Sequence, residues 1–153
     1  MNDRVHAVGT SVPQLEGDEK ASGRAQYIAD LSRPGMLHAA IVQSPHAHAR
    51  ISIGDLAAVA TRHPGLALIL THRDIPSNGH GVYPAIKDQP VLADGVVRHR
   101  GEAVLALIGE RAALEAIRDD DLPVRYEPLP PVQGIDAARS PDAALVQAGK
   151  PGN

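Results

Sequence analysis

Short runs of apolar residues, bounded by proline, glycine and polar residues, recur along the 153-residue chain. Residues 36–43 are apolar on both faces and lie between two turn sequences, which predicts a buried strand. In residues 49–53, Ile51 and Ile53 alternate with polar side chains, so this segment is predicted to be a half-buried strand. Gly101 is predicted to lie in a turn. Further strands are predicted at 66–71, 96–98, 103–108 and 124–126.

Three segments carry the signals of short helices. Asp55 can accept hydrogen bonds from the first free amides of a helix that ends at Pro64. A second helix is predicted at 110–118. The third is predicted at 140–148, because Ser140 suits the N-cap position and is followed by proline.

Two longer segments show no periodic pattern. Residues 1–24 are polar and contain glycine, which predicts extended chain and turns. Residues 72–95 hold several prolines and glycines and predict a long loop, and loops of that length usually carry function or pack against something else. A loop facing solvent would not favour its large apolar residues, which are Val82, Tyr83, Ile86, Val91 and Leu92.

Strands and helices are mixed without a repeating strand–helix–strand period. This order indicates an α+β fold with one mostly mixed sheet and short helices. A length of 153 residues suits a single domain. We expect an extended N-terminal segment at 1–24, the folded domain at 25–133, and a C-terminal helix followed by the start of a linker at 134–153.

Composition limits the residue types that can build the core and the classes of partner that the chain can bind. The chain has no Phe, no Trp and three Tyr, so its core must be aliphatic and it lacks an aromatic platform for nucleic-acid bases. A net charge of −3 without a basic stripe also argues against nucleic acid. The absence of Cys excludes disulfides and cysteine-held iron–sulfur or zinc sites, and fits a cytoplasmic protein. We expect no signal peptide and no membrane segment, because every apolar run is short.

His46 and His48 are the best candidates for metal ligands. Two residues apart on a strand, they would share one face. A metal site needs three or four ligands, and no Asp or Glu lies close to the pair in sequence. We therefore assign no metal ligand and keep weak metal binding through these two residues as the alternative.

Other polar clusters have ordinary structural explanations. Residues 119–121 are three aspartates without the spacing of a calcium loop, which predicts a solvated turn. Residues 79–81 read Gly-His-Gly but lack the third glycine and the helix of a dinucleotide-binding motif. Ser44 near His46 lacks an orienting acid. Glu102 is either a general base or a residue that caps a turn, and we assign no catalytic or cofactor-binding residue.

Several stretches resemble the large subunit of molybdenum hydroxylases of the xanthine dehydrogenase and aldehyde oxidase type. The family pattern Lys-x-Thr-Gly-x-Ala-x-Tyr-x-x-Asp occurs at 20–30, with Ser22 in place of threonine. Residues 44–51, Ser-Pro-His-Ala-His-Ala-Arg-Ile, are the most specific match, whereas 14–16 depart from the arginine and aspartate typical there. The other matching stretches, in order and with natural spacing, are 35–39, 64–65, 70–71, 74–76, 88–93, 97–104 and 124–132.

The resemblance implies that residues 25–133 form an α/β hammerhead domain of the molybdopterin-binding large subunit. Enzymes of this family hydroxylate N-heterocycles or aldehydes, using a molybdopterin cofactor, 2Fe-2S clusters and usually FAD. Their cofactor contacts and catalytic base lie in later domains, so the resemblance implies a non-catalytic scaffold or docking domain that is inactive alone. Its implied partners are the remaining molybdopterin-binding domains and the iron–sulfur and FAD subunits or domains. The alternative is a free-standing binding module that uses His46 and His48.

Overall fold

The computed structural model describes residues 8–83, 86–146 and 152–153 and divides into two units, Met1–Met36 and Leu37–Asn153. The first unit holds helix α1 (Gly17–Ala21) and the 3-10 turn η1 (Ile28–Asp30). The prediction of extended chain at 1–24 is therefore wrong at α1, and residues 1–7 lie outside the described part. An ion pair one helical turn apart, Glu16 to Lys20 at 2.7 Å, supports this helix despite its lack of apolar periodicity.

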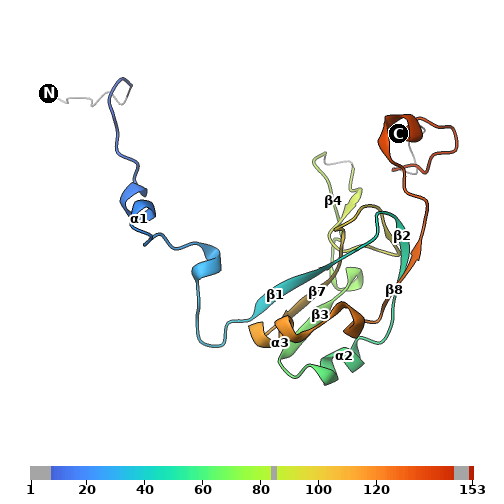
Figure 1. Ribbon diagram of the computed structural model, residues 1–153, viewed down its shortest axis with the longest axis horizontal. Coiled ribbons are helices and arrows are strands. Elements are labelled where there is room, and N and C mark those ends of the chain that lie inside the picture. The colour runs from blue at the N-terminus through green and yellow to red at the C-terminus, as the bar shows by residue number, and fades with distance from the viewer. Residues whose placement is uncertain (1–7, 84–85, 147–151) are drawn as a thin grey trace. The chain divides into compact units, whose positions relative to one another are not determined.

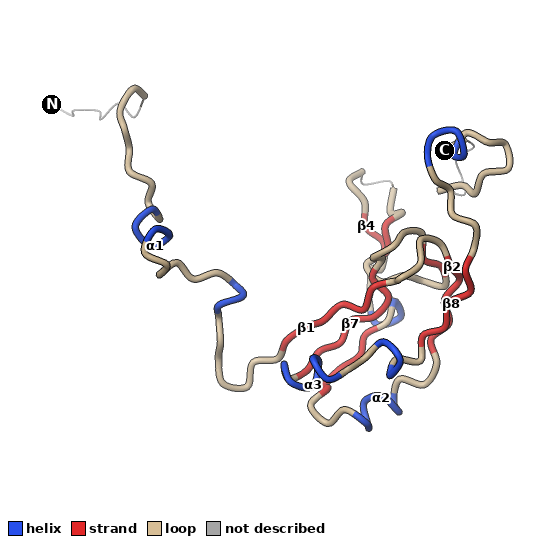
Figure 2. The backbone as a smooth tube through the Cα atoms, in the orientation of Figure 1, coloured by secondary structure: helices blue, strands red, loops and turns tan. Residues whose placement is uncertain are grey.

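The second unit contains short strands and helices, coloured by type in Figure 2. Its strands are β1 (His38–Gln43), β2 (Ala49–Ile53), β3 (Leu66–Leu70), β4 (Gly79–His80), β5 (Gln89–Pro90), β6 (Val96–Val97), β7 (Ala103–Gly109) and β8 (Val124–Pro128). Its helices are α2 (Ala57–Arg62), α3 (Arg111–Ala116) and α4 (Gly134–Ala138), and its 3-10 turns are η2 (His72–Asp74) and η3 (Asp119–Asp121). The predicted strands are confirmed in position, but the prediction that 36–43 is a buried strand is wrong, because alternate residues of β1 are exposed, among them Ile41 at 52%.

The strands form separate antiparallel sheets. The first has the order β1-β7-β3, the second β6-β2-β8, and the third pairs β4 with β5 (Figure 1). The α+β hammerhead class is as expected. The expected single mixed sheet is not found in the described part of the chain, where the strands form separate sheets and every strand pair is antiparallel. Parallel neighbours need crossovers of a dozen or more residues. The bend at 44–48 between β1 and β2 is far shorter, and it takes the chain out of the first sheet into the second.

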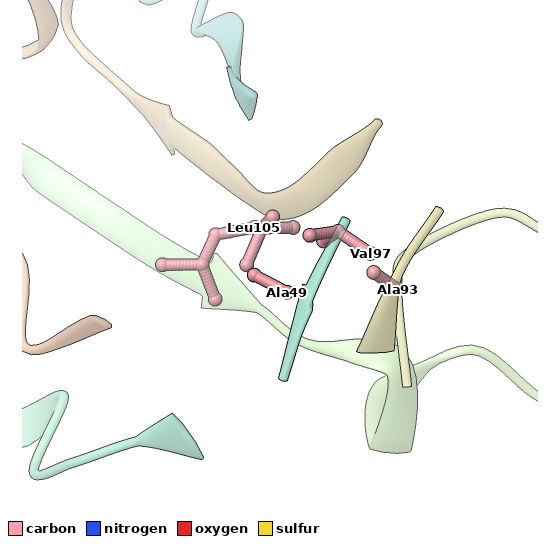
Figure 3. Packing of buried hydrophobic residues seen from close by; sticks show 5 residues of the cluster. Ala49, Ala93, Val97 and Leu105 are labelled. Carbon is pink, nitrogen blue, oxygen red and sulfur yellow. The ribbon is translucent and has the colours of Figure 1, made fainter. Parts of the chain in front are cut away.

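The core is aliphatic, as the composition predicts. Side chains of β7, β2, β6 and the segment before β6 meet in one cluster, drawn in Figure 3, whose buried members are Ala49, Ala93, Val97, Val104 and Leu105. A second cluster joins Val59 of α2, Leu107 of β7 and Leu122. Because β7 contributes to both clusters, it ties the first sheet to the second and to the helices.

The start of α2 and the segment 140–148 test the helix boundaries that were predicted from local sequence. The Asp55 carboxylate accepts a hydrogen bond from the Ala57 amide at 2.9 Å, as predicted, but the N-cap residue of α2 is Leu56, one position later than expected. The helix predicted at 140–148 is wrong over 140–146, which form turns and irregular chain, and 147–148 lie outside the described residues. Helix α4 comes earlier, and Pro141 prevents its continuation because proline disfavours helical geometry in the residue before it.

Candidate functional site

Glu102 sits in the turn that leads from β6 into β7. Its side chain is 6% exposed. One carboxylate oxygen accepts a hydrogen bond from the Arg98 backbone amide, and the other lies 3.6 Å from the Arg98 guanidinium. Both interactions close the turn at 98–102. Of the two interpretations of Glu102, this geometry supports the turn-capping residue.

Ser44 and Gly101 connect this turn to the end of β1. The Gly101 amide donates to the Ser44 carbonyl, and the Ser44 amide donates to the Glu102 carbonyl, both at 2.9 Å. The Ser44 hydroxyl, 2% exposed as a residue, exchanges hydrogen bonds with the backbone of His46. This hydroxyl therefore caps the bend, and among the described residues its hydrogen bonds go to the backbone of His46 and not to an imidazole ring.

Substitution of Gly101 should show how much the turn depends on its backbone conformation. Gly101 has φ +86°, which confirms the predicted turn, and a Cβ there would meet no other atom. We expect Gly101→Val to lower the free energy of unfolding by about 1 to 3 kcal/mol, through backbone strain alone. Urea denaturation followed by circular dichroism measures this. Arg100→Val is the matched control, since no described non-glycine residue has positive φ, and equal effects of the two variants would contradict the argument.

The prediction that His46 and His48 share one face of a strand is wrong. Both residues lie in the bend between β1 and β2. The ring of His46 packs against Tyr126, with centroids 5.0 Å apart and planes at 44°. Nδ1 of His48 lies 2.9 Å from the Pro130 carbonyl oxygen. The two rings thus have separate structural partners. Within 8–83, 86–146 and 152–153, the structure has no group of three or more His, Cys, Asp or Glu arranged to hold a metal.

The other polar clusters also serve local structure. The Asp121 carboxylate accepts a hydrogen bond from the Arg118 amide at 2.8 Å. This bond closes the 3-10 turn η3, where a turn was predicted. Gly79 belongs to β4, and a side chain at Gly81 would meet the Ile86 carbonyl. These glycines therefore allow two backbone segments to approach each other.

Tyr126 is expected to titrate late. Partial burial raises the pKa of its phenol, and the negative charge of Asp119 raises it further. A pKa raised by folding means that the neutral phenol stabilises the fold. This stabilisation is complete below the unfolded-state value near pH 10 and is lost as the pH rises through the folded-state pKa.

Ultraviolet titration of phenolate absorbance tests this expectation, with the urea-unfolded chain as reference. Tyr126→Phe should remove the latest step, whereas Tyr27→Phe, at a 59% exposed position, should leave it. A late step that survives in Tyr126→Phe would contradict the assignment.

An open cleft of about 910 Å3 lies over the turn at 98–102. Its walls come from β4–β5, the turn itself, and residues 131–133 and 144–146. The side chains in its lining that can donate hydrogen bonds include His48, His80, Arg98, His99 and Arg100. Sequence reasoning missed this cleft, because segments far apart in the chain build it and no single motif marks it.

The match to known families covers most of the chain. Residues 22–130 match the family model described as "Aldehyde oxidase and xanthine dehydrogenase, a/b hammerhead domain". Among the relatives, a probable xanthine dehydrogenase polypeptide of Bacillus subtilis is 34% identical over 134 residues, and the match covers 84% of this chain. The nicotine 6-hydroxylase large subunit of Paenarthrobacter nicotinovorans is 36% identical, again over 84% of this chain.

Solved structures agree with the sequence matches. Quinoline 2-oxidoreductase from Pseudomonas putida 86 is similar over 95% of this chain, with a TM-score of 0.75 and 38% identity. Aldehyde oxidoreductase from Desulfovibrio gigas is similar over 91%, with a TM-score of 0.75 and 29% identity. The chain spans only 17% of each of the two sequence relatives and 19% and 16% of the two solved chains.

No helix in the described part of the chain is both long and apolar enough to cross a membrane. The antiparallel sheets joined through β7, the short helices, and the agreement of sequence and structural matches all lead to one assignment. The chain belongs to the aldehyde oxidase and xanthine dehydrogenase family, as its α/β hammerhead domain.

Proposed function

We propose that the chain is a non-catalytic docking and packing domain of a molybdenum hydroxylase that acts on N-heterocycles or aldehydes. The observation that carries this proposal is the extent of the structural match. The match to a solved oxidoreductase covers 95% of this chain but only 19% of the oxidoreductase chain. The chain thus corresponds to one part of a much larger enzyme fold, and the proposal assigns the chemistry to the other parts.

The donor atoms available in the chain support this division of roles. Iron–sulfur clusters are held by cysteine thiolates, and the sequence contains no cysteine. Among described residues, the histidines and carboxylates do not gather as a ligand set. In the proposed enzyme, other polypeptide segments would therefore hold the molybdopterin cofactor, the 2Fe-2S clusters and FAD, which together supply the oxidation and electron transfer.

The loop at 72–95 supports a docking role. Its apolar side chains Val82, Tyr83 and Val91 are 88%, 69% and 44% exposed. Leu92 was expected to join them but is 2% exposed and belongs to the core, because Ala93 next to it pairs with Ala103 and draws it inward. Residues 84–85 of the loop lie outside the described part. We take these three exposed apolar side chains as the part of the loop that another chain segment covers.

Hydrogen exchange tests the docking role. We expect amides at 81–83 and 86–88 to exchange fast in the isolated chain and at least about tenfold more slowly in the intact enzyme, because contact with other domains suppresses local opening. The amides of β7 are the internal control, since this strand is paired on both sides and should be protected in both forms. Equal rates at the loop in both forms would remove the main support for docking through it.

A further inference from the structure

A side chain near the start of the loop at 72–95, that of Asn78, is bound to the backbone near the end of the loop. Its Oδ1 accepts a hydrogen bond from the Leu92 amide at 3.0 Å, and its Nδ2 donates to the Leu92 carbonyl at 2.8 Å. The Leu92 amide can only donate and the carbonyl can only accept, so just one orientation of the carboxamide makes both bonds. We call this pair of hydrogen bonds the Asn78 clamp.

The Asn78 clamp joins two sets of backbone hydrogen bonds. On one side, the Val91 amide donates to the Asn78 carbonyl at 2.9 Å, directly next to the paired strands β4 and β5. On the other side, the Ala93 amide donates to the Ala103 carbonyl, at the start of β7, at 2.7 Å. Leu92 lies between them and is 2% exposed. The carboxamide thus binds Leu92 as a neighbouring strand would, and it ties β4 and β5 to the core.

The hairpin formed by β4 and β5 depends on such support. Each strand is two residues long, and Pro90 of β5 has no amide hydrogen to donate. Even a hairpin of ordinary strand length is only marginally stable in water by itself. We call residues 78–80 and 89–92 the stem, and the exposed residues Val82 and Tyr83 the tip. The orientation of the tip therefore depends on how firmly the stem is held.

We infer that Asn78 is a positioning residue, whose clamp fixes the stem on the core and so presents the tip in one orientation for docking. This inference rests on the proposed function and gives Asn78 itself no contact with a partner. The side chains of the tip make that contact. The clamp reduces the conformational freedom that docking must remove from them. Every contact of the clamp lies within the unit Leu37–Asn153.

Asn78→Asp removes half of the clamp with almost no change in shape. The carboxylate still accepts from the Leu92 amide, but it cannot donate to the Leu92 carbonyl. At about pH 7 we expect amide exchange of Val91 and Leu92 in the isolated chain to accelerate at least about tenfold. Gln89→Glu is the matched control, because it makes the same change from amide to carboxylate at an exposed position of the stem. Its exchange rates should stay within about twofold of the wild type.

Acid should restore the clamp in Asn78→Asp. A protonated carboxyl group can donate to the Leu92 carbonyl while it accepts from the Leu92 amide, so it reproduces both bonds of the carboxamide. The ratio of exchange rates between variant and wild type, measured at each pH, should therefore fall toward one as the pH drops through the pKa of the introduced carboxyl group. A variant destabilised in any other way would not recover in acid.

Docking is measured with the rest of the large subunit from the same genome, produced as a separate polypeptide. At about pH 7, Asn78→Asp should raise the Kd at least about fivefold, because a smaller fraction of the chain presents the tip correctly. The tip variant, Val82→Ser with Tyr83→Ser, should also raise it. Adding Asn78→Asp to the tip variant should then change the Kd by less than about twofold, since the clamp acts only through the tip. Circular dichroism establishes that each variant retains its fold.

The outcomes separate this inference from the proposed function. Faster stem exchange that acid reverses, together with non-additive weakening of binding, supports the inference. Unchanged stem exchange in Asn78→Asp overturns it while the docking function stands. Faster stem exchange with an unchanged Kd, or Kd changes that multiply in the combined variant, overturns the positioning role in favour of a purely structural one. Failure of the wild-type chain to bind overturns the proposed function together with the positioning role, whatever the exchange rates.

Discussion

Leu105→Ala is expected to lower the free energy of unfolding by about 3 kcal/mol, within the range of about 2 to 5 kcal/mol measured for such truncations in cores. Leu105 is fully buried on β7 and contacts the cluster that joins the first and second sheets. In a core without Phe or Trp, leucine is among the largest groups available, so its neighbours, several of them Ala and Val, are too short to fill the cavity. Such a loss is a large part of the total stability of a typical domain.

Urea denaturation followed by circular dichroism measures this change, since the chain lacks tryptophan fluorescence. Leu68→Ala is the matched control: it removes the same atoms from a side chain that is 57% exposed in the isolated chain. We expect this control to cost less than about 1 kcal/mol. Equal losses in both variants would mean that Leu105 is not at the centre of the core.

Gly109→Ala is expected to destabilise the protein by about 3 kcal/mol, because the added methyl group has no space. A Cβ at Gly109 would lie 2.5 Å from the Gly65 carbonyl oxygen and 3.0 Å from the Leu66 Cα. Both obstacles are backbone atoms, which cannot move as a side-chain end can. The same carbonyl accepts a hydrogen bond from the Glu110 amide at 2.9 Å, so relief of the clash would also disturb this bond.

Thermal unfolding provides a second measure for Gly109→Ala. Gly17→Ala is the control, because a Cβ there would lie at an ordinary distance of 3.6 Å from the nearest atom and alanine favours the helix. The melting temperature should fall in Gly109→Ala and not in Gly17→Ala. A Gly109→Ala variant as stable as the wild type would show that β3 and β7 separate at this end without cost.

Elements with a strong local signal were predictable. The runs that became β1, β3 and β7 are short, mostly apolar and bounded by turn residues, and the run that became β2 alternates apolar and polar residues. The start of α2 is marked by a single neighbouring carboxylate, that of Asp55. The position of Gly101 also followed from its neighbours. In each case the deciding interactions lie within a few residues of the chain.

Elements decided by distant contacts were not predictable. The division into separate sheets depends on β7, which pairs with β1 and β3 rather than with its neighbour β6. His46 turns toward Tyr126 and His48 toward Pro130, about 80 residues later, and no spacing rule contains that information. Ser140 and Pro141 are a typical helix start, yet α4 ends just before them, since the two residues serve equally well to terminate a helix.

The central position of β7 has a consequence for synthesis of the protein on the ribosome. Both of its neighbours, β1 and β3, precede it in the chain, and Gln43 of β1 pairs with Ala103, 60 residues later. Synthesis at about 5 to 20 residues per second places roughly 3 to 12 s between the end of β1 and the start of its partner strand β7. During that interval the nascent chain exposes aliphatic strand segments without a sheet to join. Chaperone capture of this intermediate should therefore end when β7 emerges, and not when β1 and β3 are complete.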